Sequence, residues 1–116
     1  MGLAEKLIAR KCGKAYCEVD DEKFEILELS RRERGELQAK CRSKASGKLD
    51  TDRLEGELLA RCVCDPETSK PVFERYKQWD DVPAIITGPL IAAVMKANGF
   101  DEADLGKPEQ DDTAET

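Results

Sequence analysis

The chain has 116 residues, 38% of them charged and 5% aromatic, and its 25 acidic against 19 basic side chains give a formal charge of −6. The length predicts one domain, and the acidic balance argues against a nucleic-acid partner, because phosphate binding needs an excess of Lys and Arg. There is no histidine, which excludes Ser-His and Cys-His catalysis and His-ligated metal sites.

The acidic excess lies at the C-terminal end. Residues 100–116 carry seven acidic side chains and one lysine, and from residue 101 onward Leu105 is the only large apolar side chain. Such a segment cannot offset the entropy of ordering. We therefore predict a folded domain over residues 1–99 and a disordered acidic tail over residues 100–116.

The N-terminal third predicts a helix followed by a β-hairpin. Apolar residues at helical spacing predict a short helix over residues 3–11, ended by Gly13. Two strand-like runs, residues 15–19 and 23–29, then flank the acidic turn at residues 20–22. The remaining signals are helical, so the predicted class is mainly α (α+β) with an N-terminal β-hairpin.

Two amphipathic helices follow the hairpin. Ser30 and Glu33 form a capping-box pattern, which predicts a helix start. This helix offers only Leu37 and Cys41 as buried residues. After a polar loop, a broader apolar stripe predicts a second helix, which Asp65-Pro66 ends. Its members are Leu54, Leu58, Leu59, Cys62 and Val63.

Three of the six aromatic residues then recur at helical spacing. Phe73, Tyr76 and Trp79 stand at positions i, i+3 and i+6, on one face of a helix. We interpret this face as belonging to the core, and a ligand platform is the alternative.

The last predicted helix is apolar on nearly every side. It covers residues 82–97, Gly88-Pro89 interrupts it, and Asn98-Gly99 is a natural C-cap. The interruption predicts two helical pieces or one kinked helix. A helix that is apolar all round is either a central core helix or a surface for self-association or a partner. Both interpretations stay open here.

The sequence offers little support for catalysis or a cofactor. No phosphate-binding glycine motif or calcium loop is present, so we expect neither an enzyme nor a cofactor. The odd count of five cysteines argues for reduced thiols. A small zinc-binding or thiol-based regulator remains an alternative, with ligands from Cys12, Cys17, Cys62 and Cys64. No apolar run predicts a membrane span, and residues 1–14 show no secretory signal, so we expect a cytoplasmic protein.

Residues 23–99 resemble the tail assembly chaperones of long-tailed bacteriophages. The resemblance rests on three segments. The first is a strand that ends in L-S-R-R-E-R at residues 29–34 and leads into a charged helix. The second is a helix that runs into C-V-C-D at residues 62–65, followed by a turn and K-P-V-F at residues 70–73. The third is an apolar helix that ends in A-N-G at residues 97–99.

The resemblance implies a non-enzymatic protein of the host cytoplasm that is absent from the mature virion. Such chaperones coat the tape measure protein and recruit tail tube subunits, and many exist in two lengths through a programmed ribosomal frameshift. Residues 105–107, Leu-Gly-Lys, can be encoded by a slippery heptamer. A slip there would replace residues 108–116.

A chaperone of this kind needs an apolar surface for its partner or for its own self-association. We expect that surface on the last helix, with a smaller contribution from the three aromatic residues. The candidates are Ile85, Ile86, Leu90, Ile91, Val94, Phe73, Tyr76 and Trp79. A structural tail completion or connector subunit is the other phage role that a small self-associating domain fits.

Overall fold

The computed structural model describes residues 2–9 and 13–100. Its elements are α1 (Leu3–Ala9), β1 (Lys14–Val19), β2 (Glu22–Leu27), α2 (Arg31–Lys40), α3 (Thr51–Cys62), β3 (Val63–Cys64), the 3₁₀ helix η1 (Tyr76–Asp81) and α4 (Ala84–Asn98). The predicted α+β class with an N-terminal hairpin is confirmed. Residues 10–12, where the first predicted helix was expected to end, lie outside the described residues. So do residues 101–116, which are all but the first residue of the predicted tail.

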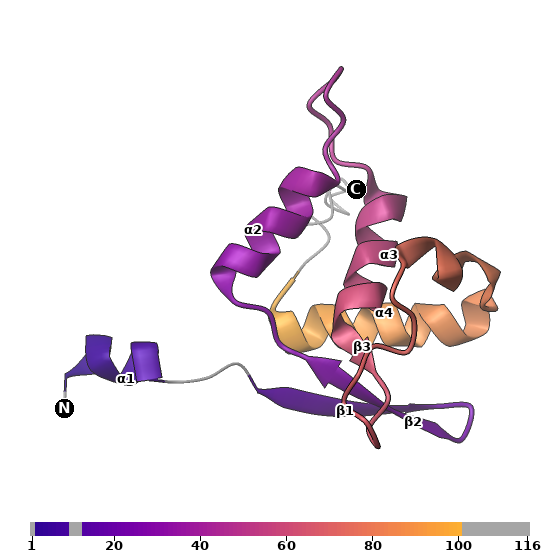
Figure 1. The fold of residues 1–116 in the computed structure, drawn as a ribbon, viewed down its shortest axis with the longest axis horizontal. Helices are drawn as coiled ribbons and strands as arrows, with labels where there is room; N and C mark the ends of the chain where they lie inside the picture. Colours follow the sequence, from indigo (N-terminus) through magenta and orange to yellow (C-terminus); the bar gives the residue numbers. More distant parts are fainter. Residues whose placement is uncertain (1, 10–12, 101–116) are drawn as a thin grey trace, which may run out of the picture.

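The hairpin forms one side of the molecule, and α2, α3 and α4 lie together beside it, whereas α1 stands apart (Figure 1). Asp20 and Asp21 form the turn of the hairpin, between β1 and β2, with φ values of 54° and 64°. Two consecutive positive φ angles define a type I′ turn, whose twist matches that of the strands. The turn is therefore shorter than the predicted three residues, since Glu22 already pairs with Val19.

A third strand extends the sheet in the order β1-β2-β3. Val63 pairs with Ile26 and Cys64 pairs with Glu25, both antiparallel. The prediction that Val63 belongs to the helical stripe is wrong, because the chain leaves the helix after Cys62 and turns extended at Val63 (φ −95°, ψ 115°). A strand of two residues is too short to show the alternation of apolar and polar side chains that marks a strand. The helical spacing of the apolar residues therefore assigned Val63 to the preceding helix.

Helix α3 runs through the centre of the core. Leu54, Leu58 and Cys62 are fully buried, as the spacing predicted. Ile26, Leu90, Val94 and Phe100 complete the core around them. Phe100 is only 8% exposed, so the folded domain extends to residue 100 and not only to the predicted boundary at residue 99.

Helix α4 is continuous from Ala84 to Asn98 with Pro89 inside it, so the two-piece alternative is wrong. Proline removes the hydrogen bond to the carbonyl four residues earlier, which here belongs to Ile85. Ile85 is 81% exposed, so the residue that loses this hydrogen bond lies at the surface. The predicted C-cap is confirmed, since Gly99 adopts the left-handed conformation (φ 68°).

The predicted capping box at the start of α2 is also confirmed. Ser30 Oγ accepts from Glu33 N–H at 3.2 Å, and Glu33 Oε1 accepts from Ser30 N–H at 3.0 Å. Leu37 and Cys41 are the buried residues of this segment, as expected. Within the ranges described above, no helix combines the length and the apolar character that crossing a membrane requires.

Candidate functional site

A groove of about 450 Å³ lies between α3, η1 and the first half of α4. Its walls combine apolar side chains with carboxylates. The lining residues are Asp52, Glu55, Gly56, Leu59, Trp79, Asp80, Val82, Ala84, Thr87 and Ile91. The groove therefore contains two of the residues that the sequence suggested for partner binding, Trp79 and Ile91.

The aromatic residues do not share one helical face, so that prediction is wrong. Arg75 has extended backbone angles (φ −118°, ψ 137°), and η1 begins only after it, at Tyr76. Phe73 therefore lies in the preceding loop. It still meets Trp79 edge to face, with ring centroids 4.9 Å apart. Trp79 is 4% exposed and belongs to the core, which agrees with the interpretation of these rings as core residues.

A glycine brings η1 close against α3. A Cβ built on Gly56 would lie 3.1 Å from Cδ2 and 3.3 Å from Cβ of Tyr76. A larger residue at this position would require the Tyr76 side chain to shift by a few tenths of an ångström. Arg53, one turn earlier on α3, places its guanidinium 5.4 Å from the centre of the Tyr76 ring. The wall of the groove is thus held by packing around Tyr76.

Acidic side chains border the groove. Asp52 and Glu55 come from α3, and Asp80 comes from η1. The half-buried Val82 and Ile91 supply apolar surface between them, whereas Leu59 and Trp79 are almost fully buried behind it. An arrangement of this kind suits an amphipathic segment that inserts apolar side chains and carries lysines or arginines beside them.

The five candidates on α4 divide into exposed and buried residues. Ile85 is the most exposed, whereas Ile86 and Ile91 are half-buried. Leu90 and Val94 are fully buried in the core of this chain. Because these two lie one turn apart, they form the inward stripe of the helix. Direct contact with a partner is therefore open to Ile85, Ile86 and Ile91, and Leu90 and Val94 hold the helix in place.

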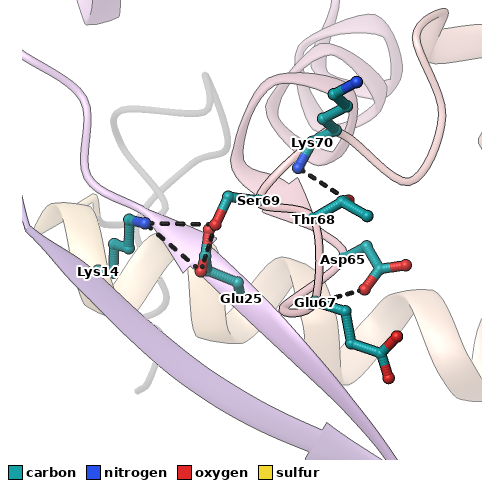
Figure 2. Close-up of polar contacts among 7 residues, drawn as sticks. All are labelled: Lys14, Glu25, Asp65, Glu67, Thr68, Ser69 and Lys70. Atoms are coloured by element: carbon teal, nitrogen blue, oxygen red, sulfur yellow. Dashed lines mark hydrogen bonds and ion pairs between the residues drawn. The ribbon is translucent and has the colours of Figure 1, made fainter.

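A second polar site lies where the loop after β3 crosses the sheet (Figure 2). Glu25 on β2 is buried, and its Oε2 accepts a hydrogen bond from Ser69 Oγ at 3.3 Å. Lys14 Nζ lies 3.7 Å from the same oxygen and donates to Ser69 Oγ at 3.4 Å. The other oxygen, Oε1, has no hydrogen-bond partner among the described atoms. The pairing with Lys14 offsets some of the cost of burying this carboxylate.

Local hydrogen bonds shape the loop that brings Ser69 to Glu25. Asp65 Oδ1 accepts from Glu67 N–H at 2.8 Å, and Thr68 Oγ1 accepts from Lys70 N–H at 3.2 Å (Figure 2). Ser69 adopts a left-handed conformation, with φ of 60°. These contacts tie β1, β2 and the loop together. No sequence pattern predicted this tie, because its three residues are far apart in the chain.

The cysteines of the zinc alternative do not assemble a site in the described residues. No group of three or more His, Cys, Asp or Glu residues suited to a metal ion is found there. Burial raises the pKa of Cys62 to about 12, and burial likewise raises the pKa of Cys64. A high thiol pKa opposes the thiolate that zinc requires. Cys12, the remaining candidate ligand besides the half-buried Cys17, lies outside the described residues.

No protein-family model, curated protein or solved structure matches this chain. The arrangement of its own residues therefore carries the functional argument. Gly56 and the acidic border at Asp52 and Glu55 were not singled out from the sequence. Their role depends on Tyr76 and Trp79 packing against α3, which is a tertiary contact.

Proposed function

We propose that this chain is a non-enzymatic phage tail assembly chaperone. It binds the tape measure protein through the groove between α3, η1 and α4 together with the exposed Ile85, which adjoins the groove-lining Ala84 on α4, and it recruits tail tube subunits during tail morphogenesis. The likeness of residues 23–99 to that family supports the identity. The structural observation that carries the proposal is the exposure of Ile85. This large apolar residue is 81% exposed and lies on α4, the helix that borders the groove.

The chemistry of the groove fits the task. A tape measure protein is a long helix whose apolar faces are exposed until the tail tube covers them. The half-buried Val82 and Ile91 offer apolar contacts to such a face, and Asp52 and Asp80 attract basic side chains beside it. Each contact is weak, so many copies bound along one long partner would act together.

The protein acts in the host cytoplasm and is absent from the mature virion. A longer form arises if the gene carries a slippery run at codons 105–107, and sequencing the gene tests this point directly. If the gene has no such run, the hypothesis of a longer, frameshifted form is wrong. Partner binding is tested by a separate experiment.

The test is co-purification from host cells that express the phage locus with an N-terminally tagged chain. We expect mass spectrometry of the bound fraction to identify a very long helical protein and a tube subunit. Ile85→Asp should abolish this recovery. Aspartate in the first turn of α4 suits the helix dipole, so the variant should fold. The matched control is Ala39→Asp on the exposed side of α2, which should retain both partners.

Two outcomes would overturn the proposal. If the chain is found in purified, complete particles, it is a structural tail subunit instead. If Ile85→Asp and Ala39→Asp recover the same partners in equal amounts, the surface around Ile85 is not the binding site.

A further inference from the structure

The hairpin leaves one backbone edge unpaired among the described residues. In the sheet order β1-β2-β3, β1 is an outer strand. Its register pairs Val19 with Glu22 across the two-residue turn, and Gly13 C=O accepts from Glu28 N–H at 3.1 Å. Because antiparallel strands alternate, the odd-numbered residues of β1 direct their N–H and C=O groups toward β2. The N–H and C=O groups of Lys14, Tyr16 and Glu18 therefore point away from the sheet.

We propose that this edge pairs, antiparallel, with β1 of a second copy of the chain. The two-fold axis passes beside Tyr16, so that Tyr16 lies opposite Tyr16 of the second copy. Lys14 then lies opposite Glu18, and Glu18 opposite Lys14. Each of the three residues exchanges both backbone hydrogen bonds with its counterpart, and the two sheets become one continuous sheet. A two-fold axis closes the assembly as a dimer.

Charge selects this register. A pairing centred on Glu18 would set two glutamates opposite each other, and one centred on Lys14 would set two lysines opposite each other. Like charges directly opposite destabilise a sheet. A pairing of Lys14 with Asp20 would extend into the turn, where Asp20 has a positive φ and is no longer extended. Only the pairing centred on Tyr16 matches opposite charges along the full strand.

The side chains of the edge are arranged for such a neighbour. Tyr16 is 57% exposed, and Lys23 Nζ lies 4.6 Å from the centre of its ring. Glu18 lies opposite Lys23 on β2. In the dimer, Lys14 of the second copy would lie on the other side of Glu18, so charges of alternating sign would continue across the sheet. A free β edge of this kind is otherwise a site of uncontrolled association.

The first experiment is sedimentation velocity over a range of protein concentrations, with a reductant present. The native chain should shift from monomer toward dimer as the concentration rises. Glu18→Lys places lysine opposite Lys14 twice in each dimer and should weaken association by about tenfold or more. The matched control is Glu22→Lys, which makes the same charge change at an exposed residue of β2. It should associate as the native chain does, and circular dichroism should show that both variants are folded.

A cross-link tests the register itself. In the proposed dimer, Ala15 lies opposite Cys17 of the second copy, at a position where the strands approach most closely. Ala15→Cys should therefore give a disulfide-linked dimer under mild oxidation, and peptide mapping should find residue 15 joined to Cys17. The native chain should not form a link from Cys17 to Cys17, because those residues are not opposite each other.

The β1 edge and the surface around Ile85 are different parts of the molecule, so edge pairing and partner binding can fail separately. A chain that stays monomeric at every concentration overturns the edge pairing and leaves binding at Ile85 untouched. The edge pairing is also overturned if the chain dimerises but Glu18→Lys weakens the dimer no more than Glu22→Lys does. A Cys17-to-Cys17 link without the link from residue 15 overturns the register.

Discussion

Asn98 at the end of α4 binds the backbone that follows the hairpin strand, at Leu29. Its Oδ1 accepts from Leu29 N–H at 2.6 Å, and its Nδ2 donates to Leu27 C=O at 3.2 Å. The same amide also donates to Val94 C=O at 3.0 Å within the helix. One side chain thus joins the C-terminal helix to the end of β2. The sequence identified Asn98 only as a component of a C-cap.

This relationship predicts that Asn98→Ala is destabilising. The substitution leaves the part-buried N–H of Leu29 and C=O of Leu27 without their partner, which costs about 1–3 kcal/mol of unfolding free energy. Urea unfolding measures the change. Lys96→Ala, at an exposed residue of the same helical turn, should stay within about 0.5 kcal/mol of the native chain. Equal losses for the two variants would show that Asn98 acts through the helix alone.

Two glycines in helices should respond to alanine in opposite directions. Nothing lies within 4 Å of a Cβ built on Gly35, so Gly35→Ala should stabilise the chain by about 0.5–1 kcal/mol through helix propensity. At Gly56 the new methyl carbon would lie 3.1 Å from Cδ2 of the Tyr76 ring, closer than an ordinary van der Waals contact. Gly56→Ala should therefore lower stability despite the same gain in propensity, by about 1–3 kcal/mol. Thermal unfolding of both variants tests the contrast, and a stabilised Gly56→Ala would refute the close packing.

Local signals account for the elements of the fold that the sequence predicted. The hairpin follows from two strand-like runs around Asp20-Asp21, and α2 follows from Ser30 and Glu33, whose side chains satisfy the first backbone groups of the helix. The buried stripe of α3 follows from the spacing of Leu54 and Leu58. In each case the residues that decide the structure are close together in the chain.

The features that were missed depend on tertiary contacts. The two-residue strand β3 exists because β2 offers a partner at Glu25 and Ile26. Helix α4 has apolar residues on nearly every side, so its pattern could not show that Leu90 faces the core and Ile85 faces solvent. Phe100 looked like the start of the tail, yet it packs into the core with the Arg34 guanidinium 4.0 Å from its ring centre.

The capping box gives α2 a defined dependence on pH. The hydrogen bond from Ser30 N–H, followed by the one from Arg61, lowers the pKa of Glu33 below its usual value. A carboxylate whose folded pKa is lowered stabilises the fold above its unfolded pKa, and this contribution is lost as the pH falls through the folded pKa. Unfolding free energy measured at several acidic pH values should therefore fall less steeply for Glu33→Gln than for the native chain. Identical slopes would show that Glu33 does not contribute.

The Ser30 hydroxyl should contribute to stability mainly through its hydrogen bond with Glu33 N–H, and less through the lowered pKa of Glu33. Ser30→Ala removes the acceptor for Glu33 N–H and should cost about 1 kcal/mol. The backbone N–H at residue 30 still donates to the carboxylate of Glu33 and is the largest cause of its lowered pKa, but the smaller lowering of this pKa by the Ser30 side chain is lost. The acidic slope should therefore lie between those of the native chain and of Glu33→Gln. The two variants together separate the two halves of the capping box.

Thiol labelling should distinguish the buried cysteines from the partly exposed one. Cys62 is fully buried and its pKa is raised to about 12, so at neutral pH it is a protonated, inaccessible thiol. Cys64 is also fully buried with a raised pKa, whereas Cys17 is half-buried. Iodoacetamide at neutral pH should therefore modify Cys17 well before Cys62 or Cys64, and all three should react in urea. Peptide mapping by mass spectrometry measures the order. Early modification of Cys62 in the folded chain would contradict this packing and would favour the alternative function of a cysteine-based regulator.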